Sequence, residues 1–121
     1  MKLINKDYWK SLINMAVIKF LVLRTLKTNP SHGYGILNQV KEFTQGCCTP
    51  TYGSVYPILK ELCEEGYAEV KFETVNNRER KVYYLTEQGE QAYLQAKEAW
   101  QDILPFLNKV MSEEVDGDGD N

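Results

Sequence analysis

The side chains best suited to contact nucleic acid lie along a short stretch, residues 49–66. Hydroxyl, phenol and ammonium groups are the ones that bind phosphates and base edges. They stand opposite an apolar face of Val55, Leu59, Leu62 and Cys63, whose three- and four-residue spacing predicts a helix. We interpret this stretch as a DNA-recognition helix. Its expected contact residues are Thr51, Tyr52, Ser54, Tyr56, Pro57 and Lys60.

A plainer interpretation of the same residues stays open. Tyr52 and Tyr56 fit half-exposed core tyrosines, and Lys60 fits an ordinary solvated lysine. The helix also has two candidate caps, Thr49 before Pro50, or Ser54. With Ser54 as the cap, the later proline at position 57 falls in the first turn, where no intrahelical hydrogen bond is lost. At the other end we expect Gly66 to terminate the helix in the left-handed conformation.

A long helix is expected at the start of the chain, from the cap Asp7 to about Thr28. The breaker cluster at residues 29–31 ends it. Its apolar residues cover more than one helical face. A helix of this kind in so small a chain needs two partners, which predicts its own core on one side and a second subunit on the other.

A second helix is expected over residues 33–44, capped by Ser31 and ended by Gly46. Its Tyr34 joins the expected DNA contacts. Two helices joined by a short turn, followed by the recognition stretch, are typical of a helix-turn-helix.

Two strands are expected after the recognition stretch, at residues 67–73 and 81–86. Asn76-Asn77 tolerates the positive φ of a hairpin tip. The hairpin predicts a winged helix-turn-helix whose basic wing contacts the DNA backbone or minor groove. The alternative is an ordinary solubilising hairpin. The expected wing contacts are Arg78, Arg80 and Lys81.

A last helix is expected from Thr86, with a seam of apolar residues seven apart that predicts packing on another helix. Pro105 either kinks this helix, which we favour, or starts a new one. The expected dimerisation residues, drawn from both terminal helices, are Tyr8, Trp9, Leu12, Ala16, Tyr93, Ala96, Trp100, Ile103, Leu104 and Leu107.

These elements predict an α+β fold, mostly helical, in which a winged helix-turn-helix carries an added C-terminal dimerisation helix. The expected units are a DNA-binding domain at 1–86, the dimerisation helix at 87–112 and a disordered acidic tail at 113–121. The tail holds five of the 17 acidic residues. The remaining 12 acids against 14 Lys and Arg leave about +2 on residues 1–112, which is compatible with DNA.

Other classes of protein have little support in the sequence. The lone His32 has no paired nucleophile or acid, so we expect no enzyme, and we expect no cofactor or metal. No signal peptide or membrane-spanning run is recognisable, which predicts a cytoplasmic protein without membrane contact. Adjacent Cys47 and Cys48 leave open a thiol- or metal-responsive switch, whereas Cys63 is most simply a core residue.

Four motifs, in this order, resemble those of the PadR family of transcriptional regulators: residues 32–35 (His-Gly-Tyr-Gly), 53–62 (Gly-Ser-Val-Tyr-Pro-Ile-Leu-Lys-Glu-Leu), 65–67 (Glu-Gly-Tyr) and 84–89 (Tyr-Leu-Thr-Glu-Gln-Gly). The resemblance covers about residues 12–110, and residues 53–57 are its most specific part. It implies a homodimeric winged-helix repressor, bound to a palindromic double-stranded operator and released by a small molecule or another signal. The wing departs from the family's pattern, because Asn76-Asn77 and residues 78–80 replace its usual Gly and Pro.

The short last helix is similar to that of the smaller, multidrug-responsive members, which hold flat aromatic compounds against a tryptophan at the dimer interface. This similarity implies an aromatic effector near Trp100, and the alternative is that Trp100 simply fills the dimer core. A winged-helix protein-interaction module without DNA binding also stays open. The expected effector residues are Trp9, Leu12, Tyr93, Ala96 and Trp100.

Overall fold

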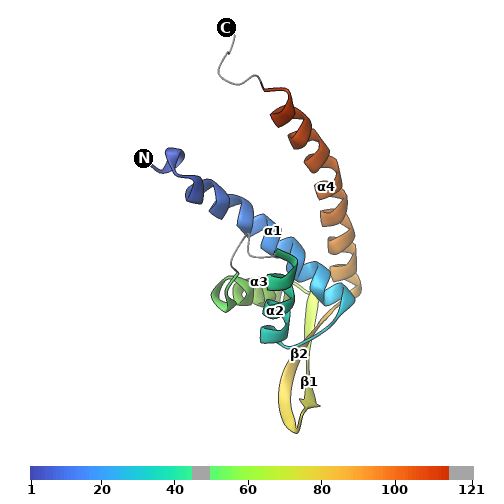
Figure 1. Cartoon of the computed structure of the whole chain (residues 1–121). Helices are drawn as coiled ribbons and strands as arrows, with labels where there is room; N and C mark the ends of the chain where they lie inside the picture. Colours follow the sequence, from blue (N-terminus) through green and yellow to red (C-terminus); the bar gives the residue numbers. More distant parts are fainter. Residues whose placement is uncertain (45–49, 115–121) are drawn as a thin grey trace.

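The computed structural model describes residues 1–44 and 50–114, and it is mostly helical with one antiparallel hairpin (Figure 1). This confirms the predicted fold class. In chain order the elements are a 3₁₀ turn at Lys2–Ile4, α1 (Lys6–Thr28), α2 (Gly33–Thr44), α3 (Tyr52–Glu64), β1 (Ala68–Val75), β2 (Arg78–Leu85) and α4 (Glu87–Ser112).

The helix α1 begins two residues earlier than the predicted cap implies, because Asn5 caps it and Asp7 does not. The Asn5 side-chain oxygen accepts a hydrogen bond from the backbone N–H of Asp7, at 2.8 Å. Asparagine caps as well as aspartate does. The carboxylate of Asp7 lies instead in the first turn, where it favours the positive end of the helix dipole. The predicted end at Thr28 is confirmed.

The core lies between the C-terminal half of α1, the helices α2 and α3, and the base of the hairpin. Small and branched apolar side chains fill it at helical spacing on all three helices. The N-terminal half of α1 extends away from this core and diverges from α4 (Figure 1). The fully buried side chains at the centre are Val22, Thr25, Leu26, Ile36, Val40, Val55 and Leu59.

The predicted limits of α2 as far as they are described, Gly33 to Thr44, are confirmed, but the expected cap Ser31 is wrong. The Nδ1 atom of His32 accepts a hydrogen bond from the Gly35 N–H at 3.2 Å. The Ser31 carbonyl is engaged elsewhere, accepting the Tyr83 N–H of β2 at 2.9 Å. The chain before α2 is thereby tied to the edge of the hairpin. The predicted helix end at Gly46 lies outside the described residues.

Both candidate caps of α3 are wrong as well, because Thr51 caps the helix. Thr51 and Ser54 form a reciprocal capping box, in which each side chain accepts the other's backbone N–H, at 3.2 and 2.9 Å. Pro57 therefore lies in the second turn and cannot donate to the carbonyl of Gly53. Gly66, with φ of +84°, ends the helix as predicted.

The hairpin is longer than predicted, with a turn of only two residues. Asn76 and Asn77 both have positive φ, 53° and 63°, as a tight hairpin turn requires. The register continues without a gap from Ala68 opposite Leu85 to Val75 opposite Arg78. Residues expected in the loop are therefore strand residues, whose side chains alternate between two faces.

The helix α4 runs unbroken through Pro105, so the alternative of a new helix there is wrong. Its cap is Thr86, whose hydroxyl oxygen accepts the N–H of Gly89 at 3.1 Å. Its first half packs on the second half of α1, where Lys27 and Glu90 form an ion pair at 3.0 Å. In the described ranges, no helix combines the length and apolarity needed to cross a bilayer.

Candidate nucleic-acid interface

Three of the predicted contact residues, Tyr34, Tyr52 and Tyr56, form one aromatic cluster between α2 and α3. The rings of Tyr34 and Tyr52 stack with their centroids 4.4 Å apart, and the Tyr56 ring lies 5.6 Å from that of Tyr52 at a tilt of 33°. Tyr34 and Tyr56 remain 60% and 40% exposed, whereas Tyr52 is half-buried between its neighbours. Two exposed phenols are thus held in place by a third.

The position of the central ring depends on Gly33, the first residue of α2. A Cβ atom at this position would lie 2.7 Å from the ring and hydroxyl of Tyr52, closer than packed atoms come. Burial raises the pKa of Tyr52, and the neighbouring Tyr34 and Tyr56 raise it further. Tyr52 is therefore a neutral hydrogen-bonding group at physiological pH, and its main contact is within the chain.

Of the other predicted residues at α3, two form its N-terminal cap and two are exposed on its surface. The hydroxyls of Thr51 and Ser54 are already engaged in the capping box, and Ser54 also donates to the Thr51 carbonyl at 2.8 Å. These two side chains fix where α3 begins. Pro57 and Lys60 are exposed, one turn or less from Tyr56, on the side of α3 that faces away from the core. Of the predicted contact residues, Tyr56, Pro57 and Lys60 therefore have exposed side chains that no contact within α3 engages.

The wing does not gather its predicted basic residues on one face. Because side chains alternate along a strand, Arg78 and Arg80 lie on one face of β2 and Lys81 lies on the other. Lys81 is on the side of α3, where its charge opposes the burial that raises the pKa of Cys63. Arg80 is half-buried, and its Nε atom has no hydrogen-bond partner among the described residues.

One basic wing residue that the sequence prediction missed is Lys71 in β1, on the same face as Arg78 and Arg80. Its ammonium group lies 5.0 Å from the centre of the Tyr84 ring. The Tyr84 hydroxyl donates to the Glu73 carboxylate, which raises the pKa of Tyr84. The signal that could have identified Lys71 is the Asn76-Asn77 pair. A turn of only these two residues pairs Val75 with Arg78, and this register places Lys71 on the face of Arg78 and Arg80.

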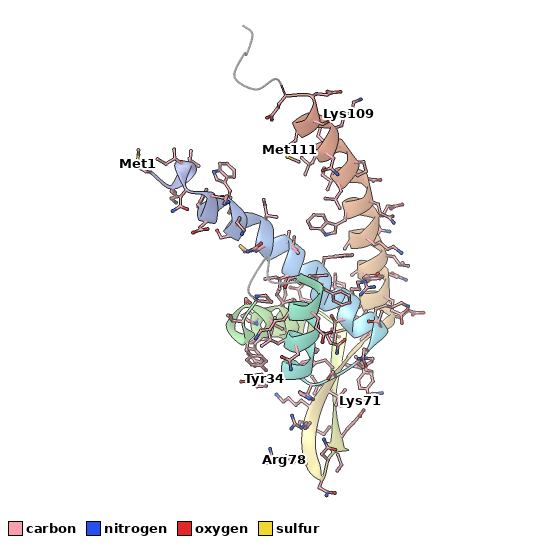
Figure 2. All side chains as sticks on the ribbon, viewed as in Figure 1. Met1, Tyr34, Lys71, Arg78, Lys109 and Met111 are labelled. Carbon is pink, nitrogen blue, oxygen red and sulfur yellow. The ribbon has the colours of Figure 1, made fainter. Side chains whose placement is uncertain are left out.

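The candidate interface residues lie toward one end of the molecule. Figure 2 shows Tyr34, Lys71 and Arg78 at the end from which the hairpin extends, while Met1 and Met111 lie at the opposite end. One end therefore carries exposed phenols and bases, and the other carries the free halves of α1 and α4.

The predicted effector residues fall into two groups that one chain does not bring together. Tyr93 and Trp100 face α1, where Phe20, missed in the sequence, stacks on Tyr93 at 5.7 Å and lies 6.2 Å from Trp100. Trp9 and Leu12 are half-exposed on the part of α1 that diverges from α4 (Figure 1). A shallow apolar hollow of about 260 Å³ is lined by Val17, Phe20, Trp100 and Leu104.

A larger hollow, about 520 Å³, lies elsewhere, between α1 and α3. It was not predicted, since its walls combine residues far apart in the sequence. At its edge Lys19 and Glu61 form an ion pair at 3.2 Å.

Of the other predicted sites, Cys47 and Cys48 lie outside the described residues. Within those residues, no group of three or more His, Cys, Asp or Glu side chains is placed to hold a metal ion.

A helix-turn-helix whose second helix exposes phenol and ammonium groups, followed by a two-stranded wing, defines the winged helix-turn-helix class. The chain belongs to the Transcriptional regulator PadR-like family, whose model matches residues 22–95. This confirms the resemblance to the PadR family. The family consists of transcriptional regulators and not of enzymes, which confirms the prediction that the chain is no enzyme.

Individual relatives agree with this assignment. Transcriptional regulator YqjI of Escherichia coli is 34% identical over 74 residues, which are 61% of this chain and 34% of that protein. Negative transcriptional regulator PadR of Bacillus subtilis is 32% identical over 80 residues, 64% of this chain and 43% of that protein. The chain thus spans less than half the length of either relative.

The fold is also similar to that of a PadR-like transcriptional regulator from Bacillus cereus, with a TM-score of 0.73. The two are 21% identical, and the match covers 81% of this chain and 94% of the other. At this level of identity the similarity concerns the fold.

Proposed function

We propose that the chain is a homodimeric repressor that binds a palindromic operator, with α3 in the major groove and the hairpin along the DNA backbone. The observation that carries this proposal is the exposed surface of α3, where Tyr56 and Lys60 project from a helix otherwise held by its core. Tyr34 extends this surface from α2, and the bases of the wing flank it. Phosphate contacts by Lys and Arg would position the helix, and the tyrosines would contact base edges.

The proposed dimer rests on the apolar surface of the diverging halves of α1 and α4. Leu104 and Leu107 are 48% and 43% exposed in the single chain, and further apolar residues continue the same row on α4. Monomers rarely expose a contiguous apolar surface of this kind. A second copy would bring its own Trp9 and Leu12 to this surface around a two-fold axis. Residues 1–86 would then contact DNA and residues 87–112 would form the interface, in the cytoplasm.

Repression is proposed from the relative in Bacillus subtilis, a negative transcriptional regulator. Release by a flat aromatic compound is proposed from the hollow at Trp100, which two chains would close from both sides.

Loss of Trp100 tests the effector site. The variant Trp100→Ala is expected to bind acridine, a planar aromatic probe, at least about tenfold more weakly, because the face that stacks on the compound is removed. Binding is measured by the change in acridine fluorescence anisotropy. The variant Leu94→Ala, altered at an exposed apolar residue next to Tyr93, is the control and should bind normally. Equal affinity in a folded Trp100→Ala dimer would reject the site.

Selection of a duplex from a random-sequence pool tests the operator. The wild-type chain is expected to enrich an inverted repeat, because two symmetry-related α3 helices contact two half-sites about one helical turn apart, roughly 34–36 Å. Enrichment of a single half-site would contradict the dimer. A pool without enrichment would contradict sequence-specific DNA binding and would support a protein-interaction module.

A further inference from the structure

Gly53 is the second residue of α3, and nothing inside the chain requires a glycine there. Positive φ among the described glycines occurs only at Gly66, so Gly53 has an ordinary helical backbone. Apart from its chain neighbours and the helix backbone, a Cβ atom at Gly53 would meet one atom within 4 Å, the Thr51 hydroxyl oxygen at 3.6 Å. That is an ordinary contact, so alanine fits at this position without rearrangement.

The other described glycines differ from Gly53 in this respect. Gly66 needs its left-handed conformation, and added Cβ atoms at Gly33, Gly35 and Gly89 would lie 2.7, 2.2 and 2.0 Å from Tyr52, Ser31 and Tyr67 atoms. Each of these four has a reason within the fold. Glycine in a helix is less stable than alanine because it loses more backbone freedom on folding. Gly53 therefore lowers the stability of α3 although no side chain occupies the space of its missing Cβ atom, and its one role within the helix is to ease the crowding of the Pro57 ring against its carbonyl.

The residues around Gly53 suggest a reason for glycine at this position. Gly53 is exposed, and Pro57 lies one turn further on the same outward side of α3, followed by Lys60. Pro57 is a second residue that weakens the helix, because it cannot donate to the Gly53 carbonyl. Gly53 and Pro57 lie at the α3 side of the hollow of about 520 Å³ between α1 and α3, and Tyr56 and Lys60 are their exposed neighbours on the outward side of α3. Glycine is the residue that permits close approach of a backbone to a ligand.

We propose that Gly53 sets the distance between α3 and DNA: the missing side chain lets the helix backbone come into van der Waals contact with the duplex, so that Tyr56 and Lys60 reach it. This inference rests on the proposed function, because it requires that the exposed side of α3 faces DNA. Gly53 acts here as a positioning residue. A methyl group at this position would hold the helix away and lengthen the hydrogen bonds of its neighbours, which weaken steeply with distance.

The test compares Gly53→Ala and Gly53→Leu with the wild-type chain, using a duplex selected by the wild-type chain. Alanine and leucine are both good helix formers. The Tm of Gly53→Ala is therefore expected to stay the same or to rise by up to about 5 °C. Affinity is expected to fall at least about tenfold in Gly53→Ala and further in Gly53→Leu, since the larger side chain separates the surfaces more. Opposite changes in stability and affinity are the signature of the proposed role.

The control is Gln95→Ala on the polar side of α4, which is exposed and uncharged and should leave affinity within about twofold. A folded Gly53→Ala chain that binds within twofold of the wild type would overturn the role of Gly53 while leaving the proposed function intact. A lowered Tm of Gly53→Ala would overturn it too, because glycine would then serve the fold. If the wild type fails to bind any selected duplex, the proposed function fails, and this inference fails with it.

Discussion

The double variant Tyr56→Ala/Lys60→Ala is expected to bind the selected duplex at least about 100-fold more weakly than the wild type, with little change in Tm. Both side chains are exposed on α3, so their removal leaves the core untouched. The lysine would lose a phosphate contact and the tyrosine a contact to a base edge, and 100-fold corresponds to about 2.7 kcal/mol for the pair. Each loss occurs twice in a dimer. Fluorescence anisotropy of the labelled duplex measures the affinity.

A matched control separates this effect from the loss of a positive charge. The variant Gln95→Ala/Lys97→Ala removes one neutral and one basic side chain from exposed positions on α4. It is expected to bind within about threefold of the wild type, since these residues lie far from the duplex. Equal losses in the two variants would show that net charge alone governs binding. Unchanged binding by the folded Tyr56→Ala/Lys60→Ala chain would remove α3 from the interface.

A second large effect is expected from Leu104→Asp/Leu107→Asp, which should convert a dimer into a monomer. In the single chain both leucines are about half exposed, so the monomer should still fold. In the proposed interface each is buried, and loss of one leucine contact costs about 1.5–3 kcal/mol, before the added cost of a buried charge. Symmetry doubles each effect. Sedimentation equilibrium should therefore report half the mass of the wild type.

The monomer is also expected to lose operator affinity, because the two half-sites would no longer be bound by one linked particle. The control Gln91→Asp/Gln95→Asp places the same charges on the polar side of α4, where both positions are exposed. It should remain a dimer. A wild-type chain that is monomeric at micromolar concentration, or a Leu104→Asp/Leu107→Asp chain that stays dimeric, would contradict the proposed interface.

Helical periodicity and turn residues predicted most of the elements correctly. The end of α1 at Thr28, the left-handed Gly66 and the hairpin tip at Asn76-Asn77 follow from local chemistry that the tertiary structure reinforces. The caps were harder to predict, because several residues near a helix start can accept the same N–H groups. At α3, Thr51 is the cap because the Ser54 side chain accepts the Thr51 N–H in return, whereas Thr49 lies outside the described residues.

The candidate interface was predicted less completely, because it depends on which residues the fold brings together. The stack of Tyr34 on Tyr52 joins two helices, and its dependence on Gly33 is visible only when both are placed. The division of the wing bases between two faces follows from a turn that is shorter than the one predicted. Phe20 was missed because its partners on α4 lie more than 70 residues further along the chain.

The measurement that tests the central proposal most directly is the affinity of the wild-type chain for its selected duplex between about 50 and 200 mM KCl. Lys60 and the wing bases Arg78, Arg80 and Lys81, present in two subunits, are eight bases, and they predict that log K falls linearly with log[KCl] with a slope of up to about −7 when each contacts one phosphate. In Tyr56→Ala/Lys60→Ala the slope should be smaller by about 2, one for each lysine of the dimer. Affinity that does not change with salt, or a slope unaltered by the loss of Lys60, would contradict DNA recognition by α3.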